Sequence, residues 1–423
     1  MSRTSVKSSA FVAVLTLIAV FPWESVGQTV QFARWRNNAT AAYSLCHDDY
    51  GEAWWGDFTF MDSILTNRGL TVSFSTIAGR LDRGDSGRAA NYVTKGRRFT
   101  THGYNHVCDT PITLTNANPR YTIAQEYDSA RARIERMIPS QGRCLYWQTP
   151  CGNQSAENVN WLRTHGFIGC RNDIDGVNPV PYGVPDPFRI GEGCYQPAGA
   201  GAAALNSYAQ AAIDGGNWAS RQSHCVSDNS GLGWAPIPLA EYRAHCDWCK
   251  QQIDAGRLWM APVQTVLMYA LERSRWTVSV TSSSATQMQC TIDNDSVINQ
   301  YVANSLFDVP LTLIAGLPGG WAASEAQVVQ NAQVIPHTVV NASTIRFDAA
   351  PWGGVVTIYS ATSVMLTQPL RVVQPAASRA GAALPMAFGL DGRLVAGSAP
   401  GMVLIAAPNG TTGAVRMVLA PNR

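Results

Sequence analysis

Two histidines four residues apart, His102 and His106, are the side chains of this sequence with the clearest chemical potential. On one helical turn, or on a tight loop that enters a helix, this spacing points both imidazoles the same way. Two neutral imidazoles provide two of the three protein ligands that an open catalytic metal site needs. The spacing alone leaves open the alternative of two solvated loop histidines.

A pair of carboxylates follows an apolar segment upstream of these histidines. Residues 41–45 are apolar enough for a buried strand, and Asp48 and Asp49 come just after it. Carboxylates at the end of a strand lie at the mouth of an α/β barrel, where functional groups gather. Two adjacent aspartates repel each other unless a cation compensates, which suggests one metal ligand and one base. A solvated Asp-Asp turn is the alternative.

Two later strands carry polar groups near their ends in the same way. Residues 144–148 have strand composition and run into a Pro/Gly turn at 150–152, and residues 219–226 form a predicted last strand that carries His224. A lone histidine at such a place is either catalytic or an ordinary satisfied side chain. Helical segments alternate with these strands, so the first part of the chain predicts an α/β fold.

Length and composition predict a globular protein of two or three domains. The 423 residues are 46% hydrophobic and 14% charged, with a formal net charge of +2. The chain has no long basic run, so we expect no nucleic-acid partner. The sequence does not indicate an oligomeric state.

The first 27 residues have the pattern of a secretory signal peptide. Arg3 and Lys7 precede an apolar run over residues 10–22, and small residues at 25–27 suit cleavage after or near Gly27. We therefore expect a secreted, periplasmic or cell-surface protein. No later segment is long and apolar enough to predict stable insertion in a membrane.

The ten cysteines are an even number, which favours disulfide bonds in an exported protein. Cys246 and Cys249 form a CxxC pattern, for which a redox or zinc site is the alternative. The sequence has no second CxxC, so we expect a disulfide from this pair to a distant cysteine. The pairing itself cannot be derived from the sequence.

The texture of the sequence changes after Trp276, where Thr, Ser, Val and Asn dominate and short β segments are separated by turn residues. The predicted organisation is a signal peptide (1–27), a catalytic domain (28–276), a β-sandwich (277–373), an Ala/Pro linker (374–385) and a small C-terminal β module (386–423). Asp391-Gly392 and Asn409-Gly410 predict hairpins in the last module.

With these motifs in order, residues 40–275 resemble the polysaccharide deacetylases of carbohydrate esterase family 4. The family's first motif ends a strand with two aspartates, as Asp48 and Asp49 do here. Its second motif, His-x-x-x-His, matches His102 to His106, and its third, a strand that enters a Pro-x-Gly turn, matches residues 150–152. Its last motif is a histidine near the end of a late strand, matched by His224. Four motifs in the correct order are fairly specific.

The resemblance implies a distorted (β/α) barrel and a divalent metal bound by Asp49, His102 and His106. Zinc is the usual metal of the family, although two histidines and one carboxylate also suit cobalt or nickel. In the implied mechanism the metal polarises the acetyl carbonyl and lowers the pKa of a water. Asp48 acts as the general base and His224 as the general acid, and the backbone N–H of Cys151 helps to stabilise the oxyanion.

The sequence also departs from the family pattern. Gln148 stands where the family has an arginine that pairs with the base, and a neutral amide cannot lower the pKa of Asp48 as a cation would. Arg171, at the end of a later strand, is the candidate replacement. Cys151 replaces the usual aromatic residue of the third motif. For the aspartate that tunes the catalytic histidine, Asp173 and Asp175 are both candidates.

The leading hypothesis is a secreted metal-dependent deacetylase that removes N- or O-linked acetyl groups from a polysaccharide. One alternative is a barrel that binds sugar without turnover, which Gln148 favours. A zinc amidase that acts on another amide is a third hypothesis. The set of Asp48, Asp49, His102, His106 and His224 favours an enzyme, because a binding module has no need for both an acid and a base.

Overall fold

The computed structural model describes residues 28–52, 58–108, 122–152, 155–172, 176–179, 186–195 and 201–360, and four short strands beyond residue 386. The predicted signal peptide, the predicted linker, Asp173 and Asp175 lie outside these described residues. Within the described part of the chain, no helix has the length and apolar character to cross a membrane.

Among the described residues, seven parallel strands close into a barrel in the order β3-β4-β5-β6-β7-β8-β2, and β2 pairs back to β3. This closure confirms the distorted (β/α) barrel expected from the sequence. The distortion lies at β2, whose first residues pair with an eighth strand, β9, before its later residues meet β3. The strands are β2 (Ala41–Tyr50), β3 (Ser73–Thr76), β4 (Arg98–Thr101), β5 (Tyr146–Trp147), β6 (Gly169–Asn172), β7 (Ile190–Cys194), β8 (Trp218–Ser223) and β9 (Leu258–Met260).

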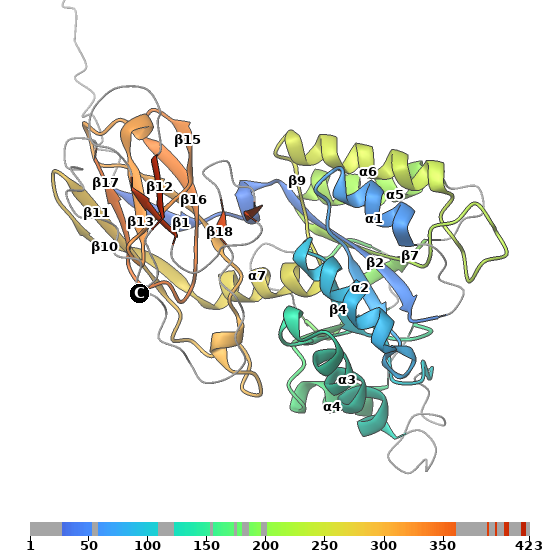
Figure 1. The fold of residues 1–423 in the computed structure, drawn as a ribbon. Coiled ribbons are helices and arrows are strands. Elements are labelled where there is room, and N and C mark those ends of the chain that lie inside the picture. Colours follow the sequence, from blue (N-terminus) through green and yellow to red (C-terminus); the bar gives the residue numbers. More distant parts are fainter. Residues whose placement is uncertain are drawn as a thin grey trace, which may run out of the picture. The chain divides into compact units, whose positions relative to one another are not determined.

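Helices surround the barrel strands, with α5 and α6 on one side of β2 and α3 and α4 on the other (Figure 1). The spacing of Ile123, Tyr127, Ala130, Ile134 and Met137 predicts an amphipathic helix over residues 122–138. The structure has a π-helical turn at Gln125–Ser129 that continues into α3. The expected core residues Ile123, Tyr127, Ala130 and Ile134 are fully buried. The α-helices are α1 (Phe58–Thr66), α2 (Arg83–Thr94), α3 (Ala130–Met137), α4 (Ala156–Thr164), α5 (Gly201–Gly215), α6 (Leu239–Asp254) and α7 (Val263–Arg275).

Strand β2 is buried along all ten of its residues, as expected for a parallel strand covered on both faces. Its second half carries His47, Asp48 and Asp49, which are polar and yet nearly inaccessible to solvent. Buried polar and charged groups are costly unless they find partners. The sequence of this strand is therefore organised around a polar site and not around packing alone.

Two antiparallel sheets follow the barrel and form a sandwich. One has the order β1-β12-β16-β15 and the other β10-β11-β17-β13-β14. Alternate residues of β11 and β16 are buried, as expected for strands that pack one face on a shared core. The strands are β1 (Thr29–Phe32), β10 (Thr277–Ser283), β11 (Gln287–Asp293), β12 (Leu311–Gly316), β13 (Gln327–Gln330), β14 (Gln333–Ile335), β15 (His337–Asn341), β16 (Thr344–Ala349) and β17 (Val356–Tyr359).

Strand β1, which lies within the predicted catalytic domain (28–276), belongs to a sheet of the sandwich. Thr29–Phe32 pairs antiparallel with β12, and Val30 and Phe32 pack on the core shared by the two sheets. The same core continues into α7 of the barrel, where the Tyr269 hydroxyl donates to the carbonyl of Ala33. A four-residue strand carries no local signal of the sheet that it will join, so the sequence could not assign it.

Glu272, in the last turn of α7, is fully buried where this helix meets the sandwich. Its Oε1 accepts a hydrogen bond from the backbone N–H of Val309 at 3.0 Å. Burial raises the pKa of the Glu272 carboxyl to about 9. The folded protein therefore keeps this proton between about pH 4.3, the ordinary glutamate pKa, and about pH 9, while the unfolded chain releases it.

We expect this burial to cost stability as the pH rises. The free energy of unfolding should fall through that window, with about 3–4 kcal/mol lost at pH 7. Glu272→Gln should remove this slope and give a protein more stable than wild type at pH 7 and 8. Urea unfolding at several pH values measures it, with the exposed Glu325 changed to Gln as the control. Parallel pH curves for Glu272→Gln and wild type would contradict the assignment.

The ten cysteines form one disulfide, between Cys108 and Cys151. The expected disulfide from Cys246 or Cys249 to a distant partner is wrong, since both thiols are free. They lie one turn apart on the buried side of α6, within the apolar core, where free cysteine packs as a small hydrophobic residue. The cysteines outside this disulfide are Cys46, Cys144, Cys170, Cys194, Cys225, Cys246, Cys249 and Cys290.

The C-terminal residues 366–423 belong to a separate unit. Within it β18 (Ala387–Phe388) pairs antiparallel with β19 (Leu394–Val395), and β20 (Met402–Ile405) with β21 (Arg416–Leu419). The two predicted hairpin turns, Asp391-Gly392 and Asn409-Gly410, lie outside the described residues.

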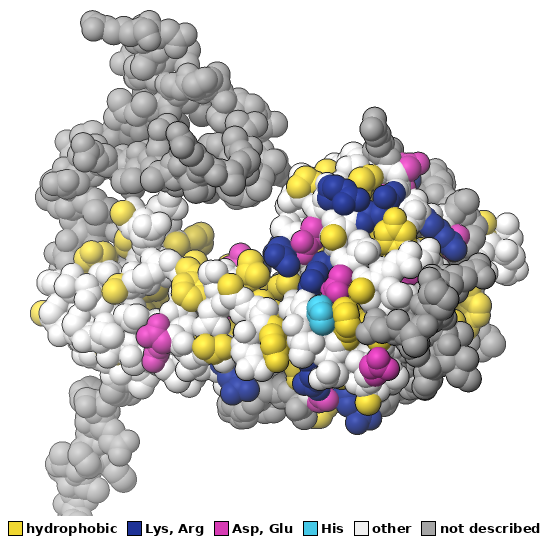
Figure 2. Space-filling view, turned by 90° about the horizontal axis from the view of Figure 1, so that it is seen from below, with side chains coloured by type: hydrophobic (Ala, Val, Ile, Leu, Met, Phe, Trp, Pro, Cys, Tyr) yellow, Lys and Arg dark blue, Asp and Glu magenta, His cyan; other side chains and the backbone are white. Residues whose placement is uncertain are grey.

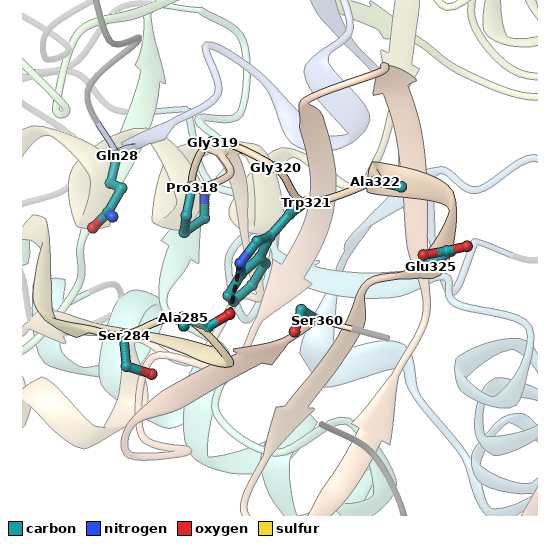
Figure 3. A pocket seen from close by; sticks show the side chains of 10 residues that line it. All are labelled: Gln28, Ser284, Ala285, Pro318, Gly319, Gly320, Trp321, Ala322, Glu325 and Ser360. Carbon is teal, nitrogen blue, oxygen red and sulfur yellow. Dashed lines mark hydrogen bonds between the residues drawn. The ribbon is translucent and has the colours of Figure 1, made fainter. Parts of the chain in front are cut away.

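A cavity of about 390 Å³ lies at one end of the sandwich. The Trp321 indole N–H donates to the carbonyl of Ala285 across it, and Pro318, Gly319 and Gly320 form one wall (Figure 3). Gln28 and Ser360 also line it, so the cavity is where the chain enters and leaves the sandwich. None of its lining residues belongs to the barrel.

Candidate metal centre and active site

Asp49, His102 and His106 converge at the C-terminal end of the barrel strands. Asp49 lies near the end of β2 and His102 directly follows β4. One ligand atom from each residue lies within 4.8 Å of the other two. Oδ1 of Asp49 is 3.4 Å from Nε2 of His102 and 3.1 Å from Nε2 of His106. The structure thus brings together the three residues that the sequence proposed as metal ligands.

The hydrogen bonds of His102 fit a metal ligand. Its Nδ1 lies 2.8 Å from the backbone carbonyl of Gln148, which can only accept, so Nδ1 carries a proton. In the neutral ring Nε2 then carries no proton. Its lone pair faces the Asp49 carboxylate, and it cannot donate a hydrogen bond to it. Burial raises the pKa of Asp49, and only hydrogen bonds from protonated His102 and His106 imidazoles would outweigh burial and hold this pKa well below its usual range. With neutral rings, the two Nε2 lone pairs face the carboxylate instead. Lone pairs that converge in this way suit a cation.

Asp48 lies beside these residues, with its Oδ2 3.7 Å from Nε2 of His102, and pairs with Arg171. The guanidinium binds the carboxylate through two contacts, Nη1 to Oδ1 at 3.0 Å and Nη2 to Oδ2 at 2.5 Å. Both side chains are about 1% exposed. Burial alone would raise the pKa of Asp48, but Arg171 more than offsets this and keeps it below its usual value. Arg171 therefore stands where the sequence analysis expected a replacement for the family arginine.

Gln148 does not take over the role of that arginine. Its side chain is fully buried, and neither amide atom has a hydrogen-bond partner among the described residues. Its backbone carbonyl contributes instead, because it fixes the tautomer of His102. The Gln148 amide therefore makes no hydrogen bond to Asp48.

Glu192, which no sequence motif indicated, completes a buried charge cluster with Arg171 and Asp48. Its carboxylate accepts from the Ser220 hydroxyl at 2.8 Å and lies 3.3 Å from Nη1 of Arg171. Burial raises the pKa of Glu192. Arg171 thus serves two carboxylates, Asp48 and Glu192. Glu192 lies on β7 (Ile190–Cys194), a short strand whose two glycines give it little sequence signal for a strand.

His224 directly follows β8, and its Nε2 lies 3.8 Å from Oδ2 of Asp49. Burial lowers the pKa of its imidazole. His47 holds the backbone at this point, because its Nδ1 lies 2.7 Å from the carbonyl of His224 while its Nε2 contacts the Tyr242 hydroxyl. Burial lowers the pKa of His47 to about 4, so the His47 ring is neutral at neutral pH and makes both contacts in this form. The structure places His224 beside the other site residues.

Cys151 lies in the turn after β5, and its disulfide ties this turn to Cys108, two residues beyond His106. Asp49, His106 and Cys151 all have positive φ values, of 64°, 61° and 57°. Non-glycine residues adopt this conformation at a cost, and such strain gathers at functional sites when the surroundings enforce it. The disulfide is one enforcing constraint, because it joins one of these positions, Cys151, to Cys108, which lies two residues beyond another, His106.

Comparisons with known proteins give likenesses at low identity. No protein-family model and no curated protein matches the chain. Solved structures similar to the chain include the Xyl-CE4 domain of a xylanase from the hindgut metagenome of Trinervitermes trinervoides, at 11% identity, TM-score 0.37, over 53% of this chain and 89% of that one. A family 4 acetyl xylan esterase from Clostridium thermocellum, in complex with cobalt, is 11% identical with a TM-score of 0.34. This match covers 55% of this chain and 91% of that one. PuuE allantoinase is 12% identical with a TM-score of 0.41, over 58% of this chain and 96% of that one.

Proposed function

We propose that this protein is a secreted, metal-dependent deacetylase that hydrolyses acetyl groups from a polysaccharide. The observation that carries the proposal is the convergence of Asp49, His102 and His106, with an Arg171-paired Asp48 and a His224 at the same barrel mouth. Three ligands, a separate ionised carboxylate and a separate imidazole are the parts that metal-assisted hydrolysis of an ester or amide requires. The order of the motifs, which resembles family 4 esterases, suggests acetyl groups on sugars as the substrate.

The three ligands would hold a divalent cation, zinc by preference, which would polarise the acetyl carbonyl and lower the pKa of a water. Asp48 accepts the proton of the attacking water, and Arg171 keeps this carboxylate ionised. His224 gives a proton to the departing nitrogen or oxygen, on a backbone fixed by His47. The Cys151 backbone N–H, in its constrained turn, stabilises the developing oxyanion.

The hypothesis of a sugar-binding barrel without turnover depended on the missing arginine at position 148. Arg171 provides that cation from another strand, with both contacts made to Asp48. This observation removes the support for an inactive barrel. A different amide as substrate is tested by the experiment below, which uses a panel.

The test is acetate release from acetylated xylan, chitin oligomers and peptidoglycan, before and after chelation and zinc re-addition. We expect release that chelation abolishes and zinc restores. Asp48→Asn should keep stoichiometric metal and lose activity by a factor of about 10² to 10⁴, the usual contribution of a positioned general base. His106→Ala should lose metal, while His337→Ala, on the sandwich, should keep metal and activity. Unchanged acetate release by Asp48→Asn would remove Asp48 from the mechanism, and a metal-free wild-type protein would overturn the proposal.

A further inference from the structure

Trp234 is a large apolar side chain left in solvent next to the candidate site. The residue is 48% exposed, whereas Trp35, Trp147 and Trp218 are buried. Aromatic side chains contribute most when their rings are covered, and an indole beside a functional cleft is a common site of contact with ligands. The exposure of Trp234 therefore calls for an explanation in terms of what covers it.

The indole lies against His224. The two ring centroids are 4.7 Å apart and the rings meet at 61°, an edge-to-face arrangement. The imidazole covers only part of the indole in this geometry, so nearly half of the residue stays accessible. A molecule that reaches His224 from solvent meets Trp234 at the same place.

The loop that carries Trp234 is ordered by its own hydrogen bonds. Val226 and Ile237 form a bridge that closes the loop at its base, and the N–H of Leu239 donates to the Asp228 carboxylate. The Asn229 side chain accepts from the N–H of Gly231, and the residue after the tryptophan, Ala235, has a φ of 48°. These contacts order the backbone of the loop that carries the indole before any ligand binds, which reduces the entropy that binding must cost.

We propose that Trp234 is a stacking surface for a pyranose ring of the substrate, beside the proton donor His224. This inference rests on the proposed function and names the class of molecule that the site recognises. An indole offers a flat, uncharged face that suits the C–H face of a pyranose, and a polysaccharide presents such rings on either side of the acetylated one. Trp234 thereby favours polymeric substrates over small acetyl esters.

The test compares Trp234→Ala and Trp234→Phe with wild type on acetylated xylo-oligosaccharides, N-acetylchito-oligosaccharides and 4-nitrophenyl acetate. Loss of one aromatic contact should raise KM for the oligosaccharides by about two- to tenfold, with a smaller change in kcat. Phenylalanine should recover part of the loss. The effect on 4-nitrophenyl acetate should be smaller, because this ester has no neighbouring sugar ring. Trp352→Ala is the matched control, since Trp352 is 46% exposed on the sandwich, and it should behave as wild type.

Titration calorimetry with the same oligosaccharides separates this inference from the proposed function. Acetate release with an unchanged KM in Trp234→Ala would overturn the stacking surface and leave the deacetylase standing. Oligosaccharide binding that Trp234→Ala weakens, without acetate release by wild type, would support the stacking surface and overturn the deacetylase. A wild-type protein that neither binds nor hydrolyses these oligosaccharides would overturn both.

Discussion

Replacement of Arg171 by glutamine should nearly abolish acetate release and destabilise the fold by about 3–5 kcal/mol, the usual cost of removing one partner of a buried ion pair. The cost is large because Arg171 is about 1% exposed and contacts two buried carboxylates, Asp48 and Glu192. Without the guanidinium, burial would raise the pKa of Asp48, so that the remaining activity would need a higher pH. Acetate release across a pH series and urea unfolding measure the two effects.

A second substitution tests whether Arg171 does for Asp48 what an arginine at position 148 would do. Gln148→Arg in the Arg171→Gln background should recover part of the activity, because position 148 is where the resembling family carries this cation. Arg163 is the control: its bond to Asp186 is partly exposed, so Arg163→Gln should change stability by less than about 1 kcal/mol. An Arg171→Gln protein with a wild-type pH profile would show that Asp48 does not depend on the pair.

Removal of the disulfide by Cys108→Ser/Cys151→Ser should lower both stability and metal affinity. The bond closes a loop with a sequence separation of 43, for which the chain-entropy estimate is about 4 kcal/mol. It also anchors the His106 loop to the turn of Cys151, and loss of such support typically costs about 10- to 100-fold in metal affinity. Thermal unfolding and a zinc competition assay measure the two quantities.

The reductant response provides the matched control for this prediction. Wild type treated with a thiol reductant should approach the double serine variant in stability and zinc affinity, and the variant itself should not respond. Equal zinc affinity in oxidised and reduced wild type would show that the disulfide does not position His106.

The sequence predicted which residues converge at the candidate metal site, because its signals are local. Asp49 ends a strand, and His102 and His106 share one short segment, so a barrel that aligns strand ends brings them together. Arg171 was recognisable only as a cation at the end of another strand, against a family pattern that placed it elsewhere. The motifs did not indicate which side chains position these residues, because the positioning contacts come from segments that are distant in the sequence.

Three features depended on such distant contacts and could not be derived. Glu192 contacts Arg171 only once β6 and β7 have paired. The glycines of β7 also gave this strand little signal in the sequence. The pairing of Cys108 with Cys151 follows from how two loops approach at the barrel mouth, which cysteine spacing does not encode. The contact between His47 and the backbone carbonyl of His224 likewise joins two segments that are far apart in the sequence.

The pairing of β1 with β12 has a consequence for the order in which the chain folds. Topologically the barrel is an insertion between two neighbouring strands of one sheet, so β1 is synthesised long before its partner exists. Because closing a loop costs more entropy as the loop lengthens, a barrel that folds first shortens the loop and brings β1 near its partner. The sandwich should therefore complete last. A cut after residue 276 would free a barrel that still carries an orphaned edge strand, so exchanging the two modules between proteins requires two junctions and not one.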